Sequence, residues 1–191
     1  MHRNIKVLLA ASILLTSGVN LFAPIYAVYI KEIGGTLFQA GALAGFYLIF
    51  EGILFLLHGR LKETFLARKH MIIIGYFLYA LGYFLYIFVS SPLQIIAIQA
   101  ILAIGEVIVT PSWSAIIADS LHKGRERTIY ANFFGYRAIF QGAAAILGGY
   151  FAIKLGFSSV FIIMTVLSLA AGAMAFLIRD KQNTPVINDI V

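Results

Sequence analysis

Apolar residues fill the chain in six long stretches separated by short polar segments. Their approximate limits are residues 5–30, 37–57, 70–90, 92–118, 130–153 and 157–178. Each stretch is near the roughly 20 residues that an α-helix needs to cross a bilayer. The stretches are continuously apolar, whereas membrane-barrel strands alternate apolar and polar positions. The pattern therefore predicts an all-α membrane protein, with six transmembrane helices within residues 1–180 and a short polar tail over residues 181–191.

Cationic residues in the connecting segments predict the orientation of these helices. One side carries most of them: Arg3, Lys6, Arg60, Lys62, Arg68, Lys69, Lys123, Arg125, Arg127, Arg179 and Lys181. The opposite side carries Lys31 and Lys154. Because cytoplasmic loops are enriched in Lys and Arg, we expect both termini in the cytoplasm. The chain is expected to be an integral, multi-pass protein of the cell (inner) membrane, in contact with the lipid bilayer.

Polar residues within the stretches follow the same order in the first three and the last three. The first two stretches of each set contain a carboxamide or a charge, and the third contains neither: the residues are Asn20 and Glu51 in the first set and Gln99, Glu106, Asn132, Arg137 and Gln141 in the second. An odd number of spans per repeat would invert the second copy relative to the first. We therefore expect a 3+3 inverted repeat, an arrangement common in secondary transporters.

Composition agrees with a membrane protein and excludes several functional classes. The chain is 61% hydrophobic and 12% charged, whereas about a quarter of the residues of a soluble domain are charged. The net charge of +6 follows from the cytoplasmic cations, so we expect no nucleic-acid partner. Cysteine is absent, and the four histidines are expected in cytoplasmic segments or at their edge, without ligand spacing. No metal and no cofactor are expected.

Three charges, Glu51, Glu106 and Arg137, lie well inside the stretches. A charge at this depth costs roughly 2.5 to 3.5 kcal/mol on insertion scales, so it usually faces a partner or a water-filled path. Gln99, Glu106 and Trp113 recur every seven residues, and Thr110 follows Glu106 by four, which places them on one helical face. Two interpretations remain open: this face binds solute or carries a proton, or Glu106 is fixed by Arg137 or a neighbouring helix.

Arg137 and Gln141 are four residues apart and share a face, so together they could hold an anionic or polar group. The alternative is an ion pair between Arg137 and Glu51 or Glu106. Complete pairing would leave one carboxylate over, and Glu106 is the preferred proton site. Asn20 faces the same cavity or bonds between helices. The tyrosines of residues 70–90 are expected to pack or to lie at the interface.

Several segments resemble the major facilitator superfamily. The first resembles the loop between its spans 2 and 3, and consists of Gly59, Glu63, Arg68 and Lys69. The second resembles the end of its span 4 and the following turn, and consists of Pro111, Ala118, Asp119, Gly124, Arg125 and Arg127. The pair Gly148–Gly149, followed by Gly156, resembles the step from span 5 to span 6. Two departures are Gln99, where the family often has arginine, and Ala144–Ala145, where its antiporters often have glycine and proline.

The resemblance implies a different position for each pair of spans. A standard member has twelve spans in two halves with the substrate between them, and this chain resembles the amino-terminal half. Spans 1 and 4 would line the cavity, spans 2 and 5 would meet the other half, and spans 3 and 6 would face outward. The cytoplasmic gate would consist of Gly59, Glu63, Arg68, Lys69, Asp119, Arg125 and Arg127. Its ion pairs would form in the outward-open state, although topology alone could explain the same cations.

The sequence thus favours a half-size secondary transporter that moves a small solute by alternating access as a homodimer. The substrate class stays open, and protons are a candidate coupling ion. One alternative is half of a split transporter that needs a different partner chain. Another is a non-transporting scaffold or a truncated transporter half. A membrane enzyme is not expected, because no Gly-x-Ser-Gly pattern occurs and no histidine is expected in the membrane interior.

Overall fold

The computed structural model describes residues 3–60, 67–119, 121, 124 and 126–178, and these are largely helical. The helices are α1 (Arg3–Phe22), η1 (Ala23–Ile25), α2 (Tyr26–Glu32), α3 (Leu37–His58), α4 (Arg68–Tyr86), η2 (Pro92–Gln94), α5 (Ile95–Ala118), α6 (Glu126–Leu155) and α7 (Phe157–Ala175). The expectation of an all-α membrane protein is confirmed. The first apolar stretch is divided into α1, η1 and α2, with Pro24 in the 3₁₀ turn, since proline cannot donate a backbone hydrogen bond.

Within the described residues, five continuous helical segments are long and apolar enough to cross a membrane: Arg3–Glu32, Leu37–His58, Pro92–Ala118, Glu126–Leu155 and Phe157–Ala175. Helix α4 contains 19 residues but is less apolar. It starts with the basic run Arg68–His70, and its tyrosines lower its hydropathy further. It packs against both α5 and α7, so much of its surface meets protein.

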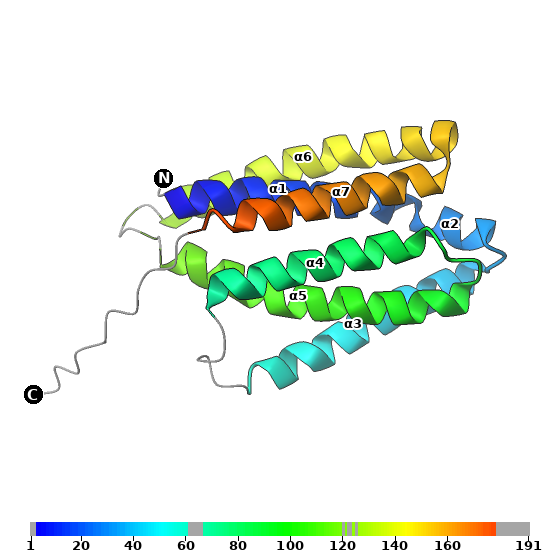
Figure 1. Ribbon diagram of the computed structural model, residues 1–191, viewed down its shortest axis with the longest axis horizontal. Helices are drawn as coiled ribbons and strands as arrows, with labels where there is room; N and C mark the ends of the chain where they lie inside the picture. The colour runs from blue at the N-terminus through cyan, green and yellow to red at the C-terminus, as the bar shows by residue number, and fades with distance from the viewer. Residues whose placement is uncertain (1–2, 61–66, 120, 122–123, 125, 179–191) are drawn as a thin grey trace, which may run out of the picture.

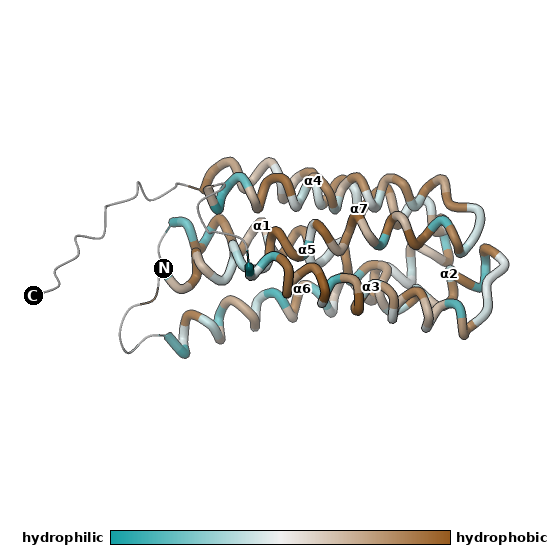
Figure 2. The backbone as a smooth tube through the Cα atoms, turned by 90° about the horizontal axis from the view of Figure 1, so that it is seen from below, coloured by the Kyte–Doolittle hydropathy of each residue, from teal (hydrophilic) through white to brown (hydrophobic). Residues whose placement is uncertain are grey.

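The long helices pack as two groups of three. Helices α1, α6 and α7 form one group and α3, α4 and α5 the other, and the contact between α4 and α7 joins the groups. Figure 1 shows α6 at one margin of the bundle and α3 at the opposite margin. In Figure 2, α4 lies on the far side of the bundle from α3 and α6. Helices α3 and α6 are therefore outlying members of their groups.

Glycines allow close helix contacts inside each group. A Cβ atom at Gly75 of α4 would lie 2.9 Å from the carbonyl oxygen of Gly105 in α5. A Cβ atom at Gly148 of α6 would lie 2.6 Å from the carbonyl carbon of Leu21 in α1. Such separations leave no room for a side chain, and small residues at helix interfaces are common in membranes. The glycines therefore determine how closely these two helix pairs approach.

The interior at the α2 end of the bundle is aromatic. Phe22 packs edge to face on Tyr29, Tyr86 and Phe161, with ring centroids 5.0–5.4 Å apart. Phe157 at the start of α7 joins this cluster, 5.0 Å from the ring of Tyr29. The hydroxyl of Tyr29 donates a 3.3 Å hydrogen bond to the backbone carbonyl of Tyr86. The cluster holds the two groups together at this end.

The described cations agree with the side assignment made from the sequence. Arg3 at the start of α1, Arg60 after α3, Arg68 at the start of α4 and Arg127 near the start of α6 all lie at the left end of the bundle in Figure 1. Lys31 in α2 lies at the other end. The bundle thus has one basic end.

Candidate functional site

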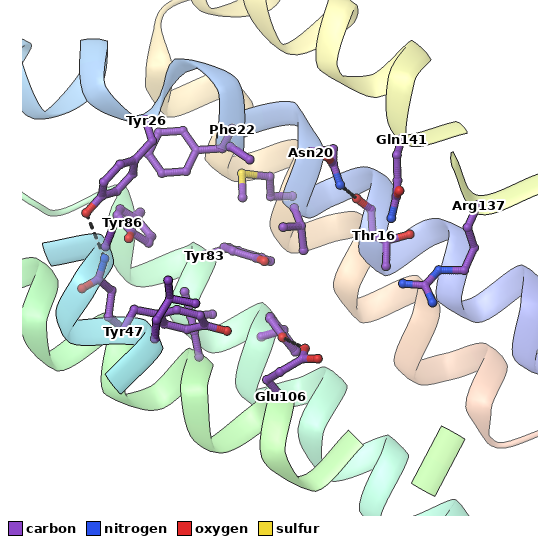
Figure 3. A pocket seen from close by; sticks show the side chains of 18 residues that line it. Thr16, Asn20, Phe22, Tyr26, Tyr47, Tyr83, Tyr86, Glu106, Arg137 and Gln141 are labelled. Carbon is purple, nitrogen blue, oxygen red and sulfur yellow. Dashed lines mark hydrogen bonds between the residues drawn. The ribbon is translucent and has the colours of Figure 1, made fainter. Parts of the chain in front are cut away.

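A cavity of about 520 Å³ lies between the two helix groups. All six long helices and α2 contribute to its wall. Its polar lining residues other than tyrosine are Thr16, Asn20, Gln99, Glu106, Arg137 and Gln141. Figure 3 shows Arg137 and Gln141 at one end and Phe22, Tyr26, Tyr47 and Tyr86 at the other. The cavity is therefore polar at one end and aromatic at the other.

Glu106 lies on α5 and is held by two hydroxyl groups. The hydroxyl of Tyr79 on α4 donates to its Oε2, and the hydroxyl of Thr110, one turn further along α5, donates to its Oε1. Both bonds are charge-assisted when the carboxyl is ionised. Thr110 is therefore a partner of Glu106 and does not itself line the cavity. Glu106 is thus fixed by neutral donors.

The amides on α1 and α5 make local contacts at the edge of the cavity. The amide nitrogen of Gln99 donates a 2.9 Å bond to the hydroxyl of Tyr26. The Oε1 atom of Gln99 is buried without a hydrogen-bond partner. Asn20 donates to the backbone carbonyl of Thr16, one turn earlier in α1. The structure places Asn20 on the cavity wall, which was one of the two interpretations. Its hydrogen bond to Thr16 stays within α1 and does not join two helices.

Arg137 projects from α6 and rests on aromatic rings. Its guanidinium carbon lies 4.7 Å from the ring centroid of Trp113 and 5.6 Å from that of Phe133. Trp113 in turn donates a 2.9 Å hydrogen bond from Nε1 to the hydroxyl of the fully buried Tyr76. This bond fixes the indole ring on which the guanidinium stacks. Cations over indole rings are attracted by the negative ring face.

The structure does not contain the ion pair considered from the sequence for Arg137. Among the described residues the one ion pair is between Arg68 and Asp119, so neither Glu51 nor Glu106 is paired with Arg137. The Nε atom of Arg137 is buried and has no hydrogen-bond partner. The cation is thus stabilised by ring faces and retains a free donor.

Glu51 lies half-buried on α3, outside the cavity wall. It is close enough to Tyr47 and Glu106 to interact with both electrostatically. The sequence grouped Glu51 with the cavity residues, but the structure places it one turn beyond Tyr47 on the outlying helix α3, and it is not among the residues that line the cavity. Its position is adjacent to the site.

The cytoplasmic gate residues are partly described. Arg68 at the start of α4 forms a 2.5 Å ion pair with Asp119 at the end of α5, and both side chains are exposed. Gly59 is the C-cap residue of α3, Lys69 follows Arg68 on α4, and Arg127 is exposed near the start of α6. Glu63 and Arg125 lie outside the described residues. One of the expected pairs is therefore present.

The tyrosines of α4 belong to the site, which the sequence interpretation missed. Tyr79, Tyr83 and Tyr86 line the cavity, and Tyr79 binds Glu106. The sequence contained a signal for this, because Tyr76, Tyr79, Tyr83 and Tyr86 have helical spacing and share one face. That face is buried against α5, α7 and the cavity. Helix α4 is therefore not simply an outward-facing helix.

Comparison with known proteins identifies the family. The family model of the Major Facilitator Superfamily matches residues 8–189. The chain belongs to this superfamily. It is therefore a membrane transporter of the facilitator kind, as the resemblance in its loops predicted. The relation to transporters does not depend on any single motif, because the match extends over nearly the whole chain.

Two curated relatives are similar along most of this chain. The uncharacterized MFS-type transporter YitZ of Bacillus subtilis is 25% identical over 156 residues, which cover 81% of this chain and 94% of YitZ. The uncharacterized MFS-type transporter MJ1560 of Methanocaldococcus jannaschii is 24% identical over 177 residues, which cover 93% of this chain but 46% of MJ1560. The chain thus spans nearly all of one relative and about half of the other.

Solved structures support the fold. The crystal structure of a peptide transporter, POT, in complex with sulfate matches with a TM-score of 0.79 at 15% identity. A structure of a mutant of this transporter matches with a TM-score of 0.78. The first match covers 92% of this chain and 37% of the transporter chain. The fold of this chain is therefore similar to that of one part of the larger POT chain.

Proposed function

We propose that this facilitator protein is a half-size secondary transporter that moves a small solute by alternating access, acting as a homodimer. The observation that carries the proposal is the cavity between the helix groups, with Glu106 and Arg137 on its wall. Both charges lie in the middle of membrane-spanning helices, where ionisable groups usually mark a transport path. Protons are the proposed coupling ion, with Glu106 as their site.

The packing pattern supports a 3+3 inverted repeat. In such a repeat α1 corresponds to α5, α3 to α6 and α4 to α7. The contact of α1 with α6 then corresponds to the contact of α5 with α3. It also maps the contact of α1 with α7 onto that of α5 with α4, and leaves the α4 with α7 contact unchanged. Such a correspondence is what a two-fold axis in the membrane plane would produce.

The outlying helices α3 and α6 supply the proposed dimer interface. Only 11% of the spanning window of each is buried, against 44% for Pro92–Ala118. Gly135, Gly142 and Gly149 recur every seven residues on α6, and a Cβ atom at any of them would meet nothing within 4 Å. Small residues in this pattern permit close approach of a second helix. In a two-fold dimer with the cavity facing the axis, α3 of one copy would face α6 of the other.

The lengths of the relatives favour a second six-helix unit. MJ1560 is about twice as long as the region that matches this chain, whereas YitZ is nearly covered by it. A second copy is the simplest source of the missing half. A different partner chain, and a non-transporting scaffold or truncated transporter half, are the alternatives. We place the protein in the inner membrane, with its basic end toward the cytoplasm. The Arg68–Asp119 pair at that end would form part of a gate.

Transport can be tested in proteoliposomes that enclose a pH-sensitive dye. We expect some members of a panel of small solutes to drive proton movement with the wild-type protein. Glu106→Gln should abolish this coupled movement, because the amide cannot exchange a proton. Glu32→Gln, at the exposed end of α2, is the matched control and should behave as wild type. Unchanged proton movement with Glu106→Gln would refute the assigned proton site.

Assembly can be tested by cysteine cross-linking, since the natural chain contains no cysteine. Gly45→Cys and Gly142→Cys, introduced together, should form a disulfide-linked dimer in membranes. Leu81→Cys on the outer face of α4 is exposed as well but lies away from α3 and α6, and it should stay monomeric. Cross-linking only in the presence of an added membrane extract from the native cell would favour a different partner chain.

A further inference from the structure

The charges on the cavity wall are not equivalent. Glu106 already accepts hydrogen bonds on both carboxylate oxygens from Tyr79 and Thr110. Arg137 has no anionic partner among the described residues, and its buried Nε atom donates to nothing. An unpaired cation in a low-dielectric site is costly, and its most favourable partner is a carboxylate that accepts two parallel hydrogen bonds. Glu106 acts on Arg137 only from beyond ion-pair distance, so the guanidinium has no carboxylate in direct contact among the described residues.

Neighbouring polar groups surround the space in front of Arg137. Gln141 lies one turn along α6, and Figure 3 shows both side chains extending from α6 toward the cavity, across from Thr16 and Asn20 of α1. Trp113 supports the guanidinium from behind at 4.7 Å and restricts its movement. A guanidinium held in this way is preorganised for a planar oxyanion, because little side-chain entropy remains to be lost.

The aromatic part of the cavity wall favours an organic anion over a free inorganic one. Phe22, Tyr26 and Tyr86 line the opposite part of the cavity (Figure 3). The volume of about 520 Å³ is within the range of sites that bind small organic molecules. Aromatic rings favour an apolar or aromatic body by contact and ring stacking. A cationic ligand would be repelled by Arg137. It would also have to compete with Tyr79 and Thr110 for the carboxylate of Glu106.

We propose that the cavity binds amphiphilic organic anions, with the carboxylate on Arg137 and Gln141 and the apolar body against the aromatic wall. That these anions are transported rests on the proposed transport function. Their binding does not, because binding requires neither flux nor coupling. It names the substrate class that the sequence left open. The ligand body would lie along the cavity from the α6 side toward α2.

Trp113 provides a direct readout of binding, because it is the one tryptophan of the chain and the guanidinium stacks on it. The experiment titrates purified wild-type protein in nanodiscs with 3-phenylpropionate and follows tryptophan emission. The neutral 3-phenylpropionamide and the cationic 3-phenylpropylamine have the same body, and acetate has the same charge without it. We expect a saturable change with 3-phenylpropionate and at least about tenfold weaker responses to the other three compounds.

Variants assign the response to Arg137. Arg137→Gln should lower the affinity for 3-phenylpropionate at least about tenfold, and Arg137→Lys should retain part of it because the charge remains. Lys154→Gln removes a cation from the far end of α6 and should leave the affinity unchanged. Circular dichroism and gel filtration verify that each variant is folded. If Arg137→Gln does not fold, Gln141→Leu replaces it, with an expected loss of several-fold.

The outcomes separate this inference from the transport proposal. Equal binding of the amide or the amine, no response to 3-phenylpropionate up to millimolar concentration, or full affinity in a folded Arg137→Gln variant would each overturn the anion site. Anion binding without solute flux in proteoliposomes would leave the site in place and count against transport. Flux of a neutral or cationic solute with no anion binding would support transport and overturn the anion site.

Discussion

Replacement of Gly148 by alanine tests how closely α6 must approach α1. The added Cβ atom would lie 2.6 Å from the carbonyl carbon and 2.7 Å from the Cα atom of Leu21. The carbonyl oxygen of Leu21 is nearer still. These are backbone atoms of a helix, so rotation of a side chain cannot relieve the overlap. Helix α1 would have to move away from α6 by more than about 0.8 Å, because the carbonyl carbon alone must go from 2.6 Å to about 3.4 Å and the oxygen starts nearer.

The adjacent Gly149 is the matched control. A Cβ atom there would meet nothing within 4 Å. Both substitutions gain the same helix propensity, about 0.5 to 1 kcal/mol, so this contribution cancels in their difference. What remains is the cost of overpacking, which is about 1 to 3 kcal/mol at a site that cannot relax easily. We expect Gly148→Ala to be less stable than Gly149→Ala by this amount.

The assay is unfolding in mixed micelles, in which rising fractions of sodium dodecyl sulfate are added to protein in a mild detergent. Circular dichroism follows the loss of helix, at a detergent excess that separates copies of the chain. The shift of α1 should also move Asn20, which lines the cavity together with Gln141, so that 3-phenylpropionate binding weakens in Gly148→Ala alone. Equal unfolding midpoints for the two variants would show that α1 and α6 are not in backbone contact at Gly148.

Three further experiments test two hydrogen bonds near the site and the ion pair at the basic end. Trp113→Phe removes the donor to Tyr76 and leaves a buried hydroxyl unpaired, at an expected cost of about 1 to 3 kcal/mol; unfolding in mixed micelles should show Tyr76→Phe in the same background recovering most of it, and an additive loss would contradict the bond. Thr110→Val keeps the shape of the side chain but removes one donor to Glu106, and should cost about 1 to 3 kcal/mol; the exposed Ser114→Ala is the control, and equal unfolding midpoints would contradict the role of Thr110. For Arg68 and Asp119, both about half exposed, a double-mutant cycle with alanine should give a coupling energy of only about 0.2 to 1 kcal/mol that falls as salt is added; a larger, salt-independent value would show that the pair is buried in solution.

Hydropathy was sufficient to predict the helical class, because a long apolar run has few ways to satisfy its backbone in a membrane. It could not predict which helices are neighbours. The grouping of α1 with α6 and α7 depends on contacts such as Gly148 against Leu21, and hydropathy carries no information about partners. The division of the first span at Pro24 was also missed, since apolar residues continue on both sides.

The site was predicted in part. Helical spacing placed Gln99 and Glu106 on one face of α5, and both line the cavity. The partner of Arg137 was missed because charge counting considers acids, whereas the structure places the guanidinium over Trp113. The role of Tyr79 was missed for a related reason: a tyrosine in an apolar helix is usually a packing residue, and only the fold brings its hydroxyl to Glu106.

If the protein acts as the proposed homodimer, Glu51 would affect the stability of a copy that has no partner. Its side chain is half-buried on α3, a helix with little protein around it. A carboxylate left in hydrocarbon costs roughly 2.5 to 3.5 kcal/mol on insertion scales, and a partner surface that supplied a hydrogen-bond donor would offset part of that cost. We therefore expect solitary copies to be the shortest-lived form in the cell. The amount of protein in the membrane would then be determined by assembly as much as by synthesis.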